Sequence, residues 1–376
     1  MAFNLSAEIE EMTTAPSIPK TAFNLTFDAP SANIQTLAIV VRMLGKYYVP
    51  ALIILGMIGN ILSLLVFLIT YLSRLSLSVY LTALAISDLG FLTALGLIWL
   101  EYIGHPLFHS TGWCQLTVYT GYVTSFLSVW YVVSFTVERY IAICHALHRP
   151  EMCTTSRARY VVCGLTALGL VAYSVSVWTS GVEEISPGYS ICVPSKRYYH
   201  IHKVVTYVDT LVTLLIPFTA ILVLNIRITY HIAYFYAKHK FTAIKVRFRG
   251  SREGHTKINL GLKAQVKVTK MLLVISSVFL LVNSPSYIIR MRLFVGKFTK
   301  SSQQSTIYEA LIQQLSQYLF YLNFSINFLL YNMCCKKFRA ALSRLFWQVR
   351  YKVMISCQVS SRKLRSIYQT RGQPES

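Results

Sequence analysis

The stretch CQLTVYTGYVTSFLSVWYVVSFTVERY, residues 114–140, carries no charged side chain until Glu138 and Arg139 near its end. A helix needs about 20 mostly apolar residues to cross a lipid bilayer, and this stretch supplies them. A charge at membrane depth is costly, so the two charged residues are expected at the edge of the membrane. The stretch therefore predicts a membrane-spanning helix with an adjacent acid and base at one mouth.

The whole chain has the composition of a membrane protein. Of its 376 residues, 54% are hydrophobic and 13% are charged, and the mean hydropathy is +0.49. These values leave too few polar side chains to cover a water-soluble globule. The pattern predicts an all-α membrane protein, a seven-helix bundle, because the alternating segments of about ten residues typical of a membrane barrel are missing from the sequence. The apolar runs cover about residues 47–71, 77–101, 113–137, 160–182, 204–230, 268–290 and 307–333.

The positions of Lys and Arg predict the orientation of the bundle, since cytoplasmic flanks carry the positive excess. One side has eight basic residues from Lys238 to Lys263 and ten from Lys336 to Arg371, whereas the other side has far fewer. We expect residues 1–46 to form an extracellular tail. In that tail Asn4 and Asn24 begin the tripeptides NLS and NLT, which are acceptor patterns for N-glycosylation.

The net charge of +22 raises the question of nucleic-acid binding. The basic residues gather at the ends of the predicted spans, where they set the orientation and favour anionic lipid headgroups. The same charge suits a cytoplasmic protein partner with an acidic surface. We therefore expect membrane lipids and a protein as partners, and no nucleic acid.

The eight cysteines divide by compartment, because only the extracellular side is oxidising. Cys114 and Cys192 are the two on that side, so we expect a disulfide between them that holds the loop after the fourth span. The others lie in lipid or in the cytoplasm. Most of these are expected to be free thiols, and palmitoylation is an alternative for Cys334, Cys335 and Cys357.

Asp88 is the one ionisable residue between Arg74 and Glu101, and it falls in the middle of the second span. A buried carboxylate surrounded by amides and a hydroxyl suits a sodium ion or a proton. A hydrogen-bonded cluster that fixes helix packing is the alternative. No other cofactor is expected. The expected companions of Asp88 are Asn60, Ser128, Asn323 and Asn327.

Arg139 lies 25 residues after Cys114, which at about 1.5 Å per residue is nearly the thickness of the bilayer. The pair Glu138–Arg139 is therefore expected at the cytoplasmic mouth. Glu138 can bind Arg139 in a resting state and release it when helices move, so the pair can switch between two states. An arginine that reaches the interface without any switching role is the alternative.

A set of motifs recurs in a fixed order along the chain: Gly59-Asn60, LAISD ending at Asp88, Cys114 with Cys192, ERY at 138–140, Pro217, Phe279, Pro285, NFLLY at 327–331 and KKFRAALSRLF at 336–346. In order and spacing, these motifs resemble those of the rhodopsin-like (class A) G-protein-coupled receptors over about residues 45–347. This resemblance implies a receptor domain at 47–333, an amphipathic helix at 334–347 and a cytoplasmic tail at 348–376, in a multi-pass protein of the plasma membrane. It also implies coupling to a heterotrimeric G protein through Glu138, Arg139, Tyr140, Asn327 and Tyr331.

Several positions depart from the usual pattern of that family. Asn283 stands where the sixth span usually has tryptophan, and Phe328 stands where the seventh usually has proline. Together with Asn225 in VLNIRI, these positions resemble the invertebrate FMRFamide-receptor group and its relatives near the thyrotropin-releasing-hormone receptors. The resemblance implies a short, amidated neuropeptide as the ligand.

The ligand class can be tested against single positions. Gly121 stands where amine receptors have an aspartate, and Tyr321 stands where visual pigments have the Schiff-base lysine, so amines are disfavoured and retinal is excluded in its usual form. The outer half offers a mixture of aromatics, amides and charges that suits a peptide, although any one of them can be simple helix packing. These candidates are Trp99, Glu101, Tyr102, Tyr122, Ser125, Asp209, Tyr287, Arg290, Gln314 and Gln317.

Three other classes of function stay as alternatives. A chemosensory receptor for a non-peptide small molecule would share the fold. A transporter would show internal repeats and broken helix pairs, which the sequence lacks. An intramembrane enzyme would need a nucleophile and base or two aspartates that converge, whereas Asp88 and Asp209 lie at different depths. We therefore expect no enzymatic activity.

Overall fold

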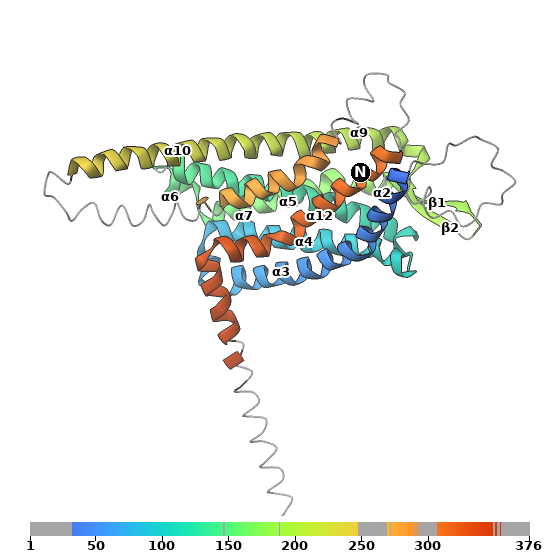
Figure 1. The fold of residues 1–376 in the computed structure, drawn as a ribbon, viewed down its shortest axis with the longest axis horizontal. Coiled ribbons are helices and arrows are strands. Elements are labelled where there is room, and N and C mark those ends of the chain that lie inside the picture. The colour runs from blue at the N-terminus through green and yellow to red at the C-terminus, as the bar shows by residue number, and fades with distance from the viewer. Residues whose placement is uncertain are drawn as a thin grey trace, which may run out of the picture.

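The structure is a computed structural model that describes residues 32–145, 147–187, 189–246, 269–270, 272–289, 292, 307–348, 350–351 and 354. Within these ranges the fold is mainly helical, and the long helices run side by side (Figure 1). Four predicted residues lie outside the described ranges: Asn4, Asn24, Arg290 and Cys357.

The first long helix begins earlier than the sequence predicts. It consists of α2 (Ala32–Met43), a five-residue π turn (Leu44–Tyr48) and α3 (Val49–Ile69). Arg42 and Lys46 interrupt the apolar run, so the expected span started at residue 47. The π turn comes just before Pro50, whose missing N–H cannot continue the α-helical pattern. The boundary placed at 46/47 therefore falls inside a continuous helical segment.

Six further long helical segments follow the predicted order closely, and α12 (Ile307–Cys334) is the last of them. The fifth is again interrupted by a π turn, Leu211–Leu215, just before Pro217. Short connecting helices are Tyr71–Arg74, Leu100–Ile103, Leu107–His109, α6 (Arg149–Met152) and Lys196–Tyr198. The remaining spans are α4 (Ser76–Trp99), α5 (Trp113–Cys144), α7 (Thr155–Tyr173) with α8 (Val175–Thr179), α9 (Tyr199–Thr210) with α10 (Ile216–Val246), and the helix Leu272–Ile289.

Six of these helical segments have the length and the apolar composition needed to cross a membrane. α12 holds the seventh place in the chain and carries several polar residues along its length. Gln317, Asn323 and Asn327 are all buried in the bundle, which explains how so polar a helix packs here. Large apolar side chains such as Leu55 and Ile54 on α3 instead lie exposed, as expected for residues that face lipid rather than water.

A β-hairpin stands at one end of the bundle, and the all-α prediction omitted it (Figure 1). Strand β1 (Ser180–Ser186) pairs antiparallel with β2 (Tyr189–Pro194), and Val182 lies opposite Cys192. The predicted disulfide between Cys114 and Cys192 is present and ties the hairpin to the start of α5. We call this end of the bundle the disulfide end.

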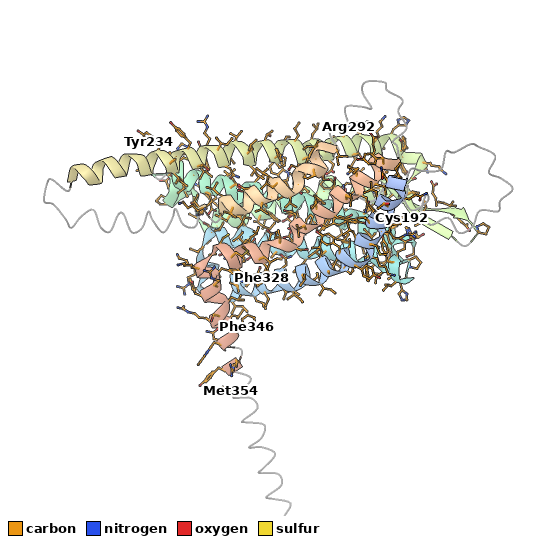
Figure 2. All side chains as sticks on the ribbon, in the orientation of Figure 1. Cys192, Tyr234, Arg292, Phe328, Phe346 and Met354 are labelled. Atoms are coloured by element: carbon orange, nitrogen blue, oxygen red, sulfur yellow. A yellow bond between two sulfur atoms is a disulfide. The ribbon has the colours of Figure 1, made fainter. Side chains whose placement is uncertain are left out.

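At the opposite end the chain breaks after α12 and continues as a helix over residues 336–348, which turns away from the bundle axis (Figure 1). Phe338 is buried against the rings of Phe67 and Tyr331, with ring centres 5.5 and 5.6 Å away. Arg339 donates to the carbonyls of Asn332 and Met333 and so caps α12. Phe346 stands on the part of this helix that leaves the bundle (Figure 2). A helix after the seventh span is present as predicted, but it begins at 336 rather than at 334, because Cys334 still belongs to α12.

Candidate functional site

Asp88 lies at the centre of the bundle and is completely buried. Its two carboxylate oxygens are held by different helices. Ser128 on α5 donates to Oδ1 at 2.8 Å, and Asn327 on α12 donates to Oδ2 at 2.7 Å. The carboxylate therefore joins α4, α5 and α12 at one point, as expected from the sequence for Ser128 and Asn327.

The other two expected companions of Asp88 are arranged differently. Asn60 uses its amide nitrogen for the carbonyls of Gly56 and Phe324, at 2.9 and 2.8 Å. Its Oδ1 is buried and has no hydrogen-bond partner among the described residues. Asn323 is also buried, at 5% exposure. Asn60 thus joins α3 to α12 through the backbone rather than through Asp88.

Phe328, at the position where a proline was expected, packs against α3. A side-chain Cβ added to Gly59 would lie 2.9 Å from the Cβ of Phe328, so the glycine permits this close approach. One turn earlier, Ser325 donates to the carbonyl of Leu52 at 3.0 Å. Small residues thus let α3 and α12 lie close together, as they commonly do between membrane helices.

Glu138 and Arg139 form a buried ion pair near the end of α5 that lies away from the disulfide. Glu138 Oε1 accepts from Arg139 Nη2 and also from the hydroxyl of Ser76, at 2.7 Å, at the start of α4. Arg139 Nε is buried and has no hydrogen-bond partner in the described part of the chain. The pairing predicted from the sequence is confirmed, and Ser76 is an added partner.

Tyr140 and Tyr331, which were expected to act with this pair, make different contacts. Tyr140 packs with the buried side chains of Ile228 and Ile232 on α10. Tyr331 is 1% exposed and meets the ring of Phe67 edge to face, with centres 5.4 Å apart. Tyr140 therefore contacts the fifth span, whereas Tyr331 joins the first span to the helix at 336–348.

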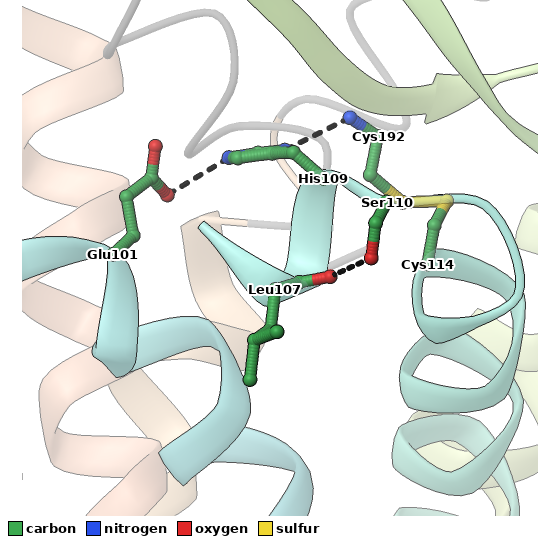
Figure 3. A network of polar contacts seen from close by, with 6 residues as sticks. All are labelled: Glu101, Leu107, His109, Ser110, Cys114 and Cys192. Atoms are coloured by element: carbon green, nitrogen blue, oxygen red, sulfur yellow. Dashed lines mark hydrogen bonds and ion pairs between the residues drawn. A yellow bond between two sulfur atoms is a disulfide. The ribbon is translucent and has the colours of Figure 1, made fainter. Parts of the chain in front are cut away.

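At the disulfide end, three residues link two loops (Figure 3). The backbone N–H of Cys192 donates to Nδ1 of His109 at 3.0 Å, and Nε2 of His109 lies 2.9 Å from Glu101. Nδ1 accepts that hydrogen bond, whereas Nε2 approaches the carboxylate without hydrogen-bond geometry, so only the contact with Cys192 is a hydrogen bond. Glu101, expected to contact ligand, thus helps to fix the hairpin beside the disulfide.

The remaining ligand candidates fall into separate groups. Tyr122 stacks on Tyr173 with ring centres 5.6 Å apart, and the Tyr173 hydroxyl donates to Asp209 at 2.6 Å. Tyr287 meets the ring of Phe218 edge to face. Gln317 Nε2 donates to Ser286 at 3.4 Å.

Trp99 and Tyr102 lie on the other side, near the first helix. Trp99 packs in the cluster that contains Val41 and Val49, and a Cβ on Gly45 would lie 2.6 Å from the Tyr102 hydroxyl. Ser125 on α5 and Gln314 on α12 are half-buried. The predicted ligand-binding residues therefore do not all contact one another in the structure.

Three residues of these sites were missed from the sequence: Ser76, His109 and Tyr173. Ser76 and His109 lie in or beside short connections between spans, where serine and histidine are common and carry no special signal. Tyr173 was part of an apolar run, and its hydroxyl gave no sign of a buried partner. The presence of Asp209 in a span could have pointed to Tyr173, because a buried carboxylate needs a hydrogen-bond donor on a neighbouring helix.

The described residues contain no group of three or more His, Cys, Asp and Glu side chains that could hold a metal ion together. A zinc or iron centre built from these residue types is thus not found in the part of the chain that the structure describes. At Asp88 both carboxylate oxygens accept hydrogen bonds, one from the hydroxyl of Ser128 and one from the amide nitrogen of Asn327.

A bundle of this topology, with its disulfide, central aspartate and Glu-Arg-Tyr motif, belongs to a known class. The model of the 7 transmembrane receptor (rhodopsin family) matches residues 59–331, and the chain belongs to this family. It is therefore a rhodopsin-like G-protein-coupled receptor with seven spans, a multi-pass membrane protein and not an enzyme.

The chain is similar to several characterised receptors over most of its length. It is 30% identical over 309 residues to the thyrotropin-releasing hormone receptor of Bos taurus, covering 77% of this chain and 75% of the relative. For the human receptor of that name, identity is 30% over 318 residues, with the same coverage. For human neuromedin-U receptor 2, identity is 26% over 310 residues, covering 79% and 70%. The resemblance to thyrotropin-releasing-hormone receptors is thereby confirmed.

Proposed function

We propose that this receptor lies in the plasma membrane with its N-terminus outside, binds a short amidated peptide at the disulfide end and activates a heterotrimeric G protein at the other. The observation that carries the proposal is the similarity, over more than three quarters of the chain, to receptors named for thyrotropin-releasing hormone and neuromedin U. The orientation is supported by the basic residues of the sequence, and it makes Asn4 and Asn24 candidate glycosylation sites.

The proposed ligand site lies between the hairpin and the bundle. We assign to it the aromatic rings of Tyr122 and Tyr287, the amides of Gln314 and Gln317 and the carboxylate of Asp209, although the structure holds them in separate contacts. Oε1 of Gln314 is buried and has no hydrogen-bond partner among the described residues, so it is a ready acceptor for a peptide N–H. Fixing of the hairpin by the disulfide and His109 supports a stable mouth over this site.

The proposed switch is the contact between Arg139 and Glu138. In the structure the arginine is held inside the bundle by the carboxylate, which corresponds to a resting arrangement. A ligand that favours a second arrangement must bind that arrangement more tightly. Release of Arg139 from Glu138 would then expose the guanidinium to the G protein, together with Tyr140 and the basic stretch from Lys238 to Lys263. The side chains of that stretch lie outside those the structure describes.

The Asp88 cluster is proposed as a sodium site that stabilises the resting arrangement. The charge of Asp88 and the hydroxyl oxygen of Ser128 support this ion, whereas Asn327 meets the carboxylate through its amide nitrogen. The unpartnered Oδ1 of Asn60 is a further oxygen in this region of the bundle. When bound, sodium would neutralise the carboxylate, and this chain's own residues hold α4, α5 and α12 together around it.

The cysteines after α12 are proposed as a lipid attachment point. Cys334 is exposed and Cys335 is half-buried, and both stand where the chain turns from α12 into the helix at 336–348. A palmitoyl chain at Cys334 would strengthen contact with the inner leaflet. Cys357 lies outside the described residues.

A screen tests the proposed function directly. Cells that express the receptor are exposed to a synthetic library of short peptides, each with a free or an amidated C-terminus, and calcium and cyclic nucleotide are recorded. Amidated peptides are expected to give responses that untransfected cells lack. If small non-peptide odorants or metabolites activate the receptor and none of the peptides does, the chemosensory alternative replaces the peptide.

A further inference from the structure

Asp209 is a buried carboxylate whose charge has no partner in the described structure. Its exposed fraction is 8%, and it lies on α9, about 15 Å along the helix from Tyr199. No Lys, Arg or His among the described residues lies within 4.0 Å of it. A buried charge without a counter-charge is expensive, so this site is incomplete as it stands.

The surroundings hold the carboxylate in place without neutralising it. Tyr173 on α7 donates its hydroxyl to Oδ1 at 2.6 Å, which is the distance of a strong hydrogen bond to a charged oxygen. The ring of Tyr173 is in turn stacked on Tyr122 of α5, with planes inclined by 9°. The backbone carbonyl of Asp209 accepts from Thr213. Asp209 on α9 is thus held in place by a tyrosine of α7 that is itself packed on α5. The hydroxyl that orients the carboxylate is neutral, so the negative charge is not balanced.

We propose that Asp209 recognises a cationic group of the ligand, a guanidinium or an ammonium, and that Tyr173 is the residue that positions it. This inference rests on the proposed function, because it names the chemistry of the peptide at that same site. The cation can come from an arginine, a lysine or the free N-terminus of the peptide.

The test is a double-substitution cycle between peptide and receptor. Peptides that activate the wild-type receptor are resynthesised in matched pairs: arginine against citrulline, lysine against norleucine, and free against acetylated N-terminus. Each pair is measured on wild type and on Asp209→Asn, which keeps an oxygen for the Tyr173 hydroxyl. On wild type, neutralising the recognised group should raise the half-maximal concentration about 30-fold or more. On Asp209→Asn the two members of that pair should agree within about twofold.

Two further variants separate recognition of the cationic group from general effects on receptor folding. Tyr173→Phe keeps the stacked ring and removes the donor, so it should weaken the cationic peptide about fivefold while leaving the neutral one nearly unchanged. Glu183→Gln makes the same change of charge on the hairpin, where Glu183 pairs with the exposed Lys196, and it should change neither peptide. Surface expression of all variants is measured in parallel.

The results separate this inference from the proposed function. If peptides activate the receptor and neutralising their cations changes wild type and Asp209→Asn equally, Asp209 is a packing residue and the inference is overturned. Active peptides that carry no cation would overturn it as well. If no peptide of the library activates wild type, the proposed peptide function fails first, and the cation site fails with it.

Discussion

Ser76, at the start of α4, donates its hydroxyl to the carboxylate of Glu138 on α5 over 2.7 Å. The same oxygen also accepts from Arg139, so one atom joins two helices and holds the arginine. All three groups lie at the end of the bundle opposite the disulfide. Because Arg139 is only 8% exposed, the structure shows it bound inside the protein rather than presented to a partner.

Glu138→Gln should raise signalling in the absence of ligand. The amide oxygen still accepts from Ser76, but the negative charge that holds Arg139 is lost. Hydrogen bonds to charged groups contribute about 1.5–3 kcal/mol, so basal nucleotide exchange on a G protein should rise about tenfold or more. Ser76→Ala is the control, because it removes the neutral donor and keeps the ion pair. A smaller rise is expected there, and equal basal rates in wild type and Glu138→Gln would mean that this pair does not restrain the receptor.

How much of this arrangement the sequence could predict depends on the kind of interaction. The spans, the disulfide and the helix at 336–348 follow from hydropathy, compartment and amphipathic spacing, and all are present. The Glu138–Arg139 contact follows because adjacent charges at a membrane edge have few other partners. The contacts of Asp88 with Ser128 and Asn327 were predictable because lipid offers no hydrogen bonds, so buried polar groups pair with one another.

Other features could not be predicted from the sequence. Asn60 donates to the backbone carbonyls of Gly56 and Phe324. Every residue has such a carbonyl, so the sequence does not show which ones Asn60 will bind. The hairpin forms in a loop between two spans, and the disulfide and His109 fix it to the rest of the chain. The early start of the first helix at Ala32 was hidden by Arg42 and Lys46.

Cys192→Ser should weaken the disulfide end. Losing a disulfide costs about 2–5 kcal/mol in small secreted domains, and here the bond holds the hairpin over the proposed ligand site. Surface expression, measured by antibody on intact cells, and peptide binding should both fall. Cys163→Ser, at an exposed free thiol on α7, is the matched control and should behave as wild type. Normal trafficking and binding of Cys192→Ser would show that the bond is dispensable.

His109→Phe should loosen the hairpin while leaving the disulfide intact. The phenyl ring fills the space of the imidazole but leaves the Cys192 N–H and the Glu101 carboxylate without their partner. An unsatisfied buried donor costs about 1–3 kcal/mol. Hydrogen exchange of the purified receptor should therefore be faster in residues 180–194 than in wild type. His109→Gln, which can accept from Cys192, should recover part of the protection, and unchanged exchange in His109→Phe would argue against a fixing role.

Asp88→Asn should abolish any effect of sodium on agonist affinity. If sodium prefers the resting arrangement, reciprocity requires that agonist affinity falls as sodium rises. Sodium is titrated against choline at constant ionic strength with an active peptide. Wild type should lose affinity and Asp88→Asn should not. A sodium effect of equal size in both proteins would place the ion elsewhere, and no effect in wild type would mean that sodium is not coupled to ligand binding here.

Arg139→Ala provides the most direct test of the receptor as a G-protein switch. The measurement is peptide-stimulated nucleotide exchange on purified heterotrimeric G protein, with wild type and Arg139→Ala reconstituted at equal density and peptide binding measured on the same samples. The substitution removes the guanidinium but leaves the disulfide end untouched, so binding should persist while stimulated exchange falls to the receptor-free rate. Arg157→Ala, an exposed arginine at the start of α7, should exchange as wild type does. Full stimulation by Arg139→Ala would contradict the assignment of this residue as the coupling group.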